Sequence, residues 1–185
     1  MVVNAVDVAR AALTHAPDAL FVSSLGTATS ALRIASDDGS HLYFGGAMGS
    51  ALACALGVAD AVPGRGVVAL LGDGELLMGA SSLWSVSGLA PRNLLIVVLS
   101  DGRYSITGGQ PLGSRTAFAE VAEALPALSG VRAGSIGELA DGLAAIALPG
   151  LVEAVVDDRS WPGPSPFVDP HSVRARFAAR VAESS

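Results

Sequence analysis

Short apolar runs alternate along the chain with longer stretches whose apolar residues have helical spacing. Residues 67–71 and 94–99 are continuous apolar runs, which is typical of central parallel strands covered on both faces. Further strands are expected at residues 21–24, 41–44, 131–134 and 151–156, and helices at about residues 3–14, 26–35, 46–62, 75–89, 116–125, 136–147 and 172–183. The alternation predicts an α/β fold, a three-layer parallel sheet with helices on both faces.

Two carboxylates follow two of these strands directly. Asp73 comes straight after residues 67–71, within Leu-Gly-Asp-Gly-Glu, and Asp101 opens a turn after residues 94–99. In a right-handed β-α-β unit the carboxyl ends of parallel strands meet at one edge, so we expect the two aspartates side by side. Oxygen ligands suit Mg²⁺ or Ca²⁺ rather than zinc, and Mg²⁺ held by one or two carboxylates completes its shell with water and phosphates. The pattern therefore predicts a phosphorylated cofactor or substrate.

Two other segments are candidates for contact with a ligand. Residues 26–30 open a predicted helix with hydroxyls and free backbone amides, where a phosphate would be favoured. Ordinary N-capping by Ser or Thr explains the same residues equally well. Gly45 and Gly46 precede another helix and would permit close approach of the backbone to a ligand.

The composition narrows the class of protein. The chain has 185 residues, 51% of them hydrophobic and 15% charged, which favours one tightly packed domain at residues 1–160 followed by an arm with a terminal helix at residues 161–185. The net charge is −6 and every basic residue is arginine, so nothing suggests nucleic-acid binding. Cys54 is the single cysteine, which excludes an intrachain disulfide and favours a buried structural thiol.

Targeting signals are not evident in the sequence. No apolar run approaches the ~20 residues needed to span a bilayer, and the N-terminus has no basic region followed by an apolar core. We therefore expect a cytoplasmic protein without a membrane partner. The high hydropathy favours a protein partner, because surplus apolar surface usually marks an interface.

The two aspartates belong to a longer pattern: Gly-Asp-Gly, some two dozen residues, then a polar pair and Gly. This pattern resembles the fingerprint of thiamine diphosphate (ThDP) enzymes. The segments GGAMGS at 45–50, ELLM at 75–78 and YSITGGQP at 104–111 are similar to the cofactor-binding half of phosphonopyruvate and sulfopyruvate decarboxylases. The resemblance covers roughly residues 20–157 and implies the ThDP-binding fold.

The resemblance implies roles for individual residues. Asp73 and Asp101 would bind Mg²⁺ together with the backbone carbonyl of Arg103. Met48 would be the apolar residue beneath the folded cofactor, although a core methionine is the alternative, and the carbonyl of Gly46 would accept from the 4′-amino group. Other residues that the resemblance assigns to the cofactor are Thr27, Thr29, Ser30, Gly72, Gly74, Glu75, Tyr104 and Ser105. Gly74 and Gly102 could also be turn glycines only.

The chain departs from the family at one position. The family usually carries two asparagines where this chain has Ser100 and Asp101. If Asp101 is the ligand, the local charge with Mg²⁺ and diphosphate is about −3 instead of about −2. We expect a tighter dependence on the metal, with Arg103 offsetting the excess. The alternative is a degenerate, non-catalytic site.

The function implied is that of a lyase: the cofactor-binding, β-type subunit of a split ThDP- and Mg²⁺-dependent 2-oxo acid decarboxylase. No catalytic residue is assigned to this chain, because Glu75 lies on the diphosphate side and reads as a structural acid. A companion pyrimidine-binding subunit would supply the activating glutamate, in a hetero-oligomer with two or more copies of each chain, and this chain would be inactive alone. Substrate contacts could come from Tyr104, Ser105, Thr107 and Gln110, or these could form a polar surface loop.

Three alternatives remain at this point. A ThDP-dependent carboligase or acyltransferase keeps the cofactor and changes the fate of the intermediate. A regulatory subunit with a dead site is motivated by Asp101. A nucleotide-binding Rossmann domain is disfavoured because no Gly-x-Gly-x-x-Gly follows a strand. The distal group of the substrate, phosphonate, sulfonate or carboxylate, stays open.

Overall fold

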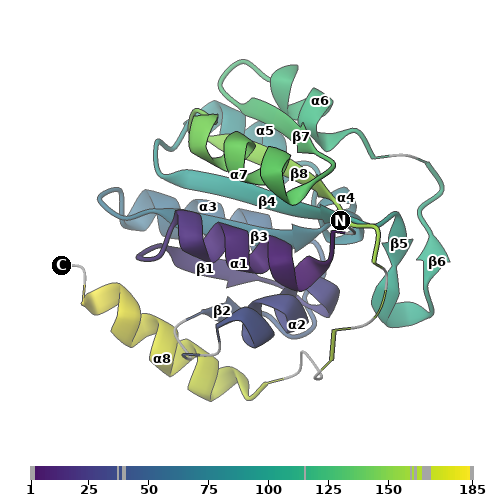
Figure 1. Cartoon of the computed structure of the whole chain (residues 1–185). Helices are drawn as coiled ribbons and strands as arrows, with labels where there is room; N and C mark the ends of the chain where they lie inside the picture. The colour runs from purple at the N-terminus through teal and green to yellow at the C-terminus, as the bar shows by residue number, and fades with distance from the viewer. Residues whose placement is uncertain are drawn as a thin grey trace.

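A computed structural model describes residues 3–36, 38, 41–114, 116–158, 160, 162–163 and 168–183. Its described residues form one six-stranded, fully parallel sheet in the order β2-β1-β3-β4-β8-β7. The strands are β1 (Leu20–Ser23), β2 (Leu42–Tyr43), β3 (Val67–Gly72), β4 (Leu94–Ser100), β7 (Ser129–Ala133) and β8 (Gly150–Val155). A separate antiparallel pair, β5 (Arg103–Tyr104) and β6 (Gln110–Pro111), projects beyond the carboxyl ends of the central strands (Figure 1).

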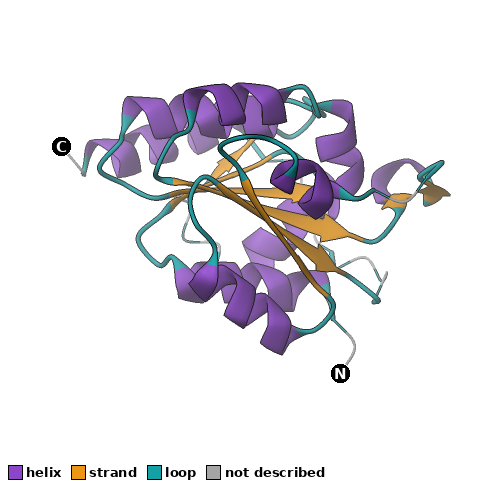
Figure 2. Cartoon of the chain, turned by 90° about the horizontal axis from the view of Figure 1, so that it is seen from above, coloured by secondary structure: helices purple, strands orange, loops and turns teal. Residues whose placement is uncertain are grey.

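Helices cover both faces of the sheet, as the view along it shows (Figure 2). On one face lie α1 (Ala5–His15), α2 (Gly26–Ala35) and α7 (Ile136–Ala145); on the other lie α3 (Ala51–Ala61), α4 (Asp73–Met78), α5 (Ser82–Leu89) and α6 (Phe118–Glu123). The predicted α/β class and three-layer architecture are therefore confirmed. None of the described helices combines the length and hydropathy needed to cross a bilayer.

The central strands explain why their sequences are apolar at every position. In β3, Val68 and Leu70 enter the core on the side of α1, whereas Val67, Ala69 and Leu71 enter the core on the side of α3. Successive side chains of a strand point to opposite faces, so a strand covered twice needs apolar residues throughout. These buried strands hold the loops at their carboxyl ends in fixed positions.

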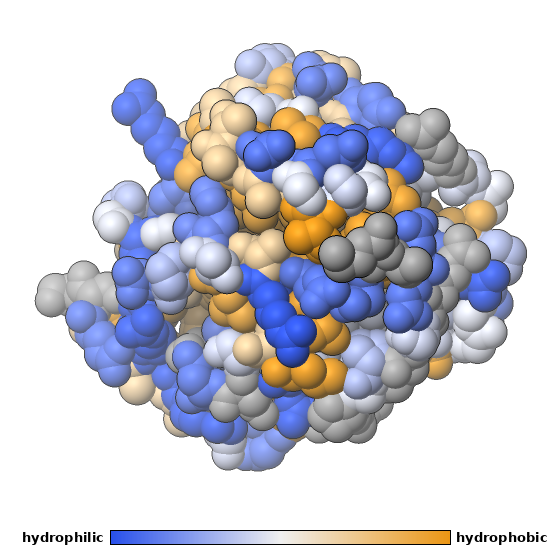
Figure 3. Space-filling model, in the orientation of Figure 1, coloured by the Kyte–Doolittle hydropathy of each residue, from blue (hydrophilic) through white to orange (hydrophobic). Residues whose placement is uncertain are grey.

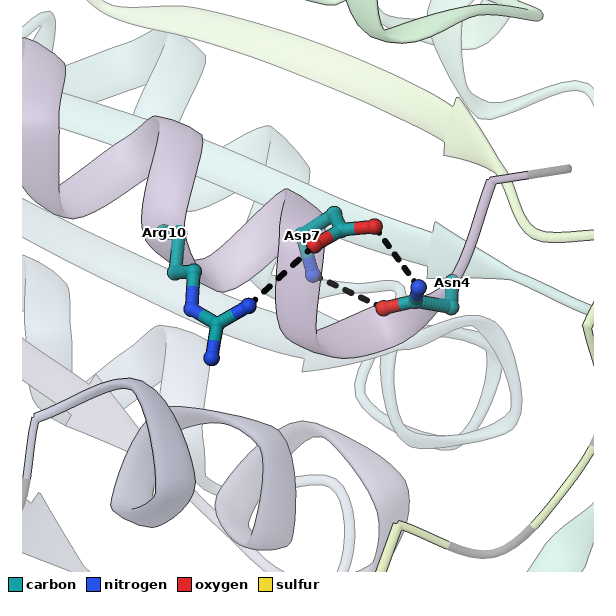
Figure 4. A network of polar contacts seen from close by, with 3 residues as sticks. All are labelled: Asn4, Asp7 and Arg10. Atoms are coloured by element: carbon teal, nitrogen blue, oxygen red, sulfur yellow. Dashed lines mark hydrogen bonds and ion pairs between the residues drawn. The ribbon is translucent and has the colours of Figure 1, made fainter. Parts of the chain in front are cut away.

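The first helix begins at a side-chain network (Figure 4). The Asn4 side chain accepts from the Asp7 amide at 2.9 Å and donates to the Asp7 carboxylate at 2.6 Å. Arg10 donates to the other oxygen of Asp7 at 3.4 Å. Asn4 is thus an N-cap, and the acidic residue in the first turn suits the positive end of the helix dipole.

Two expected helices differ from the structure. The prediction of one helix over residues 75–89 was wrong, since α4 ends at Met78 and α5 begins at Ser82. The chain bends at Gly79, where a Cβ would collide with the carbonyl oxygen of Gly49. The helix expected after the Gly45-Gly46 break and running to about residue 62 is α3, which begins at Ala51 because residues 45–50 form turns in which Gly45 and Gly49 take φ of 70° and 89°.

The C-terminal helix α8 (Pro170–Ala182) packs beside β2, the short strand at one edge of the sheet (Figure 1). Val173 and Phe177 are buried there, while hydrophilic side chains gather over the helix on the face drawn in Figure 3. Arg65 donates to the carbonyl of Arg180 at 2.6 Å. The turn expected at residues 37–40 and the extended segment at 161–166 fall largely outside the described residues.

Candidate functional site

A pocket lies at the carboxyl ends of β1, β3 and β4. The chain runs from β1 outward to β2 and then returns to β3 on the other side of β1, so the pocket lies at a topological switch point. Its walls are residues 25–28 after β1, residues 72–75 after β3, and Asp101 with residues 103–107 after β4. Ligands of open α/β sheets bind at such a position.

Asp73 is the buried acid of this pocket, with 1% of its surface exposed. One carboxylate oxygen accepts from the Gly74 amide and the other from the Gly102 amide, both at 2.7 Å. Burial raises the pKa of Asp73 to about 6, against the opposing effect of the Gly102 amide, and the neighbouring Asp101 charge adds to the rise. The ionised carboxylate is therefore electrostatically unfavourable and suited to a cation.

Asp101 lies at the start of the turn that reaches Asp73. Its two oxygens accept from the Arg103 amide at 2.9 Å and from the Ser105 hydroxyl at 3.0 Å. Each carboxylate oxygen retains a further lone pair for a metal. No three His, Cys, Asp or Glu residues of the described part of the chain are placed so that they could hold a metal ion together, so a divalent ion here would have two carboxylates and complete its shell with carbonyl, water or phosphate oxygens.

Glu75 also lines the pocket, but its carboxylate holds another segment of the chain. Its carboxylate, 7% exposed, accepts from the Gly49 amide at 2.8 Å and from the Ala51 amide at 3.2 Å. Ser50, the N-cap of α3, provides no side-chain hydrogen bond of its own. Glu75 thus caps α3 from a distance and positions the loop that carries Met48.

Gly74 is required for space. A Cβ at this position would lie 2.7 Å from Cδ1 and Cε1 of Tyr104 and 3.5 Å from Cε of Met48. Gly74 is helical, so its role is close approach rather than a positive φ. Tyr104 and Met48 therefore converge on the glycine of the Gly-Asp-Gly motif, and both line the pocket.

The residues after β1 separate into two groups. Thr27 lines the pocket, and no side chain caps the start of α2, so its first amides are open to a ligand. Thr29 and Ser30 are fully buried instead, and the Thr29 hydroxyl bonds the Ser23 hydroxyl at 2.9 Å. The structure therefore does not bring Thr29 or Ser30 to the pocket. Gly46 is exposed and also lies outside the lining residues.

The hairpin after β4 covers part of the pocket. Its 3₁₀ turn, Ser105–Thr107, reaches the start of α2, where a Cβ at Gly26 would lie 3.4 Å from Cδ1 of Ile106. Gln110, expected to contact the substrate, is exposed outside the lining and braces the hairpin tip through bonds of 2.9 and 2.8 Å with Thr107. Leu25 lines the pocket without any motif that could have predicted it, and Ile106 lines it from within the YSITGGQP segment, which had given this residue no role.

This fold and pocket agree with the family comparison. The family model described as "Thiamine pyrophosphate enzyme, C-terminal TPP binding domain" matches residues 24–153. The chain therefore belongs to this family of ThDP-binding domains, and the resemblance drawn from the motifs is confirmed.

Relatives and solved structures agree with this assignment. The chain is 40% identical to phosphonopyruvate decarboxylase of Streptomyces viridochromogenes over 89% of its own length and 42% of the relative's. It is 38% identical to sulfopyruvate decarboxylase subunit beta of Methanothermobacter thermautotrophicus over 50% of each chain. ThDP-dependent 4-hydroxybenzoylformate decarboxylase of Rhodococcus jostii shares the fold, with a TM-score of 0.66 and 24% identity over 86% of this chain and 34% of the other. The chain thus spans about two fifths of the Streptomyces relative.

Proposed function

We propose that this chain is the cofactor-binding subunit of a ThDP- and Mg²⁺-dependent 2-oxo acid decarboxylase of the phosphonopyruvate and sulfopyruvate type. The observation that carries the proposal is the pair of carboxylates formed by buried Asp73 and half-buried Asp101, at the carboxyl ends of adjoining strands, where the Gly102 amide donates to Asp73. The pair faces a pocket that also contains the uncapped start of α2. A doubly charged ion and a diphosphate have complementary partners in this one pocket.

The residues present fit the metal and the diphosphate. Asp73 and Asp101 would ligate Mg²⁺ with the carbonyl of Arg103, and the cation would offset the burial and the Asp101 charge that together raise the pKa of Asp73. Thr27 and the first amides of α2 would hold diphosphate oxygens. The domain would comprise residues 1–160, with residues 161–185 as an arm, in a cytoplasmic protein.

The remaining residues would shape the organic part of the site. ThDP, when bound, supplies the nucleophilic carbon and the electron sink for decarboxylation. Met48 would support the cofactor from below, held in place because Glu75 fixes its loop. Gly74 leaves room for Tyr104, and Tyr104 and Ser105 would close the site from the hairpin.

The activating glutamate would come from a companion pyrimidine-binding subunit. Glu75 is committed to two backbone amides, and Asp73 and Asp101 are assigned to the metal. A relative from Methanothermobacter carries the name subunit beta, which favours a split enzyme. We propose a hetero-oligomer with two or more copies of each chain, inactive unless both are present.

Reconstitution tests this proposal. The chain, its candidate companion and their mixture are supplied with ThDP and Mg²⁺, and CO₂ release is followed with phosphonopyruvate, sulfopyruvate and pyruvate. Only the mixture is expected to turn over, and EDTA is expected to stop it. Robust turnover by the chain alone would contradict the split site, and a mixture inert toward every 2-oxo acid would contradict the decarboxylase.

A non-catalytic subunit is the second candidate. It is favoured because both carboxylate oxygens of Asp101 already accept hydrogen bonds within its own turn, from the Arg103 amide and the Ser105 hydroxyl. Calorimetric titration with ThDP and Mg²⁺ separates the two, since a scaffold with a degenerate site gives no heat with or without the companion. Product analysis with an added aldehyde distinguishes decarboxylation from carboligation or acyl transfer.

A further inference from the structure

Arg103 differs in charge from everything else that lines the pocket. Among the described lining residues Asp73, Glu75 and Asp101 are acidic, whereas Arg103 alone is basic. With Mg²⁺ and a diphosphate at the two aspartates, the local charge would be about −3. A substrate with a second anionic group beyond its carboxylate is repelled by this charge, so a positively charged side chain in the pocket lining would be needed to bind it.

The hairpin presents the Arg103 side chain without covering it. Arg103 opens β5 and is exposed, and its Nη1 lies 4.0 Å from the position that a Cβ of Gly109 would occupy. Gly109 has φ of 73°, which disfavours a side chain there, and a side chain would crowd the guanidinium. No carboxylate of the described residues forms an ion pair with Arg103. The guanidinium is therefore available to a ligand.

Two neighbouring hydroxyls of the hairpin are already committed. Ser105 donates its proton to Asp101 at 3.0 Å, and Thr107 donates its proton to Gln110 at 2.9 Å. A hydroxyl has one proton, so neither can donate to an anion without breaking its bond within the hairpin. The five N–H groups of Arg103 remain, in the planar arrangement that matches a tetrahedral oxyanion.

We propose that the Arg103 side chain binds the distal tetrahedral oxyanion of the substrate, phosphonate or sulfonate, and so selects dianionic and trianionic 2-oxo acids over pyruvate. This inference rests on the proposed function. It gives the side chain a role separate from that of the Arg103 carbonyl at the metal. A guanidinium that only offset the charge of the metal site would instead affect cofactor binding and all substrates alike.

The test compares Arg103→Gln and Arg103→Lys with Arg92→Gln in the assembly loaded with ThDP and Mg²⁺. Arg92 is exposed in the turn before β4, at the opposite end of the sheet, so its replacement removes the same charge elsewhere. The ratio of kcat/KM for phosphonopyruvate, or for sulfopyruvate, to that for pyruvate is measured for each variant. Arg103→Gln is expected to lower this ratio about 10- to 100-fold, mainly through KM, with partial recovery in Arg103→Lys and no change in Arg92→Gln.

Comparing phosphonopyruvate with sulfopyruvate shows which distal group the site prefers, because Arg103→Gln lowers the kcat/KM ratio more for the preferred substrate. An unchanged ratio in Arg103→Gln, or an equal fall for pyruvate together with weaker ThDP binding, would overturn the inference. If the assembly decarboxylates no 2-oxo acid, the proposed function fails but the inference can still be tested. The affinity of methylphosphonate for the loaded assembly, measured by calorimetry, should then be at least tenfold weaker in Arg103→Gln than in the parent. Equal affinities would refute the binding of the oxyanion by Arg103.

Discussion

Two buried carboxylates, Asp73 in the pocket and Glu153 on β8, are 1% and 0% exposed and yet differ in their surroundings. Glu153 accepts from Nη1 of Arg132 at 3.0 Å and from the Ala119 amide at 3.2 Å, which joins β7, β8 and α6. Asp73 has two backbone amides, no ion pair with any described residue, and Asp101 beside it. A structural acid is matched by a cation of the chain, whereas an acid left unmatched at a pocket is suited to a cation from outside.

The largest expected effect is on cofactor binding, which should depend on Asp73 and not on Glu153. Asp73→Ala should weaken Mg²⁺-dependent ThDP binding by more than about 1,000-fold, because it removes a charged metal ligand. Glu153→Gln, a change at an equally buried acid outside the pocket, should bind as the parent does. Calorimetric titration with Mg²⁺ and ThDP measures both, and Asp73→Ala binding within tenfold of the parent would place the metal elsewhere.

Removing Arg132, the ion-pair partner of Glu153, should leave Glu153 a buried acid without a cation, as Asp73 is. Arg132→Met leaves Glu153 buried without a cation, which should lower the free energy of unfolding at neutral pH by about 3–5 kcal/mol. Arg174→Met, at an exposed position of α8, is the matched control and should change it by less than about 0.5 kcal/mol. Urea denaturation monitored by circular dichroism gives both values. Equal losses would show that the ion pair is not what holds β7 and α6.

The stability of the chain without divalent ions should depend on pH through Asp73. Because its pKa is raised to about 6 in the folded state, the folded form holds the proton more tightly than the unfolded form. Its contribution is present below about pH 4 and is lost as the pH rises through 6, by about 3 kcal/mol in all. Asp73→Asn should therefore be more stable than the parent at pH 7.5 and similar to it at pH 4. Thermal melts in EDTA across this pH range check the prediction. If the melting temperatures of the parent and of Asp73→Asn changed with pH in the same way, the pKa of Asp73 would not be raised by folding.

The smallest expected effect concerns the neighbour of Asp73. Asp101→Asn keeps an oxygen ligand and removes one negative charge, so Mg²⁺-dependent ThDP binding should be preserved or strengthened, by up to about tenfold. Titrations of this variant are compared with those of the parent at equal Mg²⁺ concentration. Loss of binding would give the carboxylate a positive role, such as its bond to the Ser105 hydroxyl.

The central part of the fold could be predicted because burial alone determines it. Strands at residues 67–71 and 94–99 are apolar on both faces, and the helix at residues 26–35 was predicted with the bounds of α2. The break between α4 and α5 could not be predicted, since it depends on Gly79 meeting Gly49, a contact between segments far apart in sequence. The hairpin β5–β6 escaped prediction because two-residue strands carry no periodicity.

The site divides in the same way. Motif spacing brought Asp73, Asp101, Met48, Tyr104 and Ser105 to one pocket, because loops after adjoining strands converge there. The inward turn of Thr29 and Ser30 follows from helix phase, which the motif does not encode. Glu153 did leave a signal: a lone acid inside the apolar run of β8 indicates a buried charge with a partner.

Glu75 fastens the loop beneath the pocket, while Asp101 and Ser105 fasten the hairpin above it. The loop that carries Met48 and the hairpin after β4 are therefore held in place by two different carboxylates, Glu75 and Asp101. Under the proposed function, replacements in the hairpin beyond Asp101 would change which acid is accepted, whereas Asp101 itself would remain a ligand of the metal. If the chain has the proposed function, its substrate preference would be free to diverge during evolution while its dependence on the vitamin stayed unchanged.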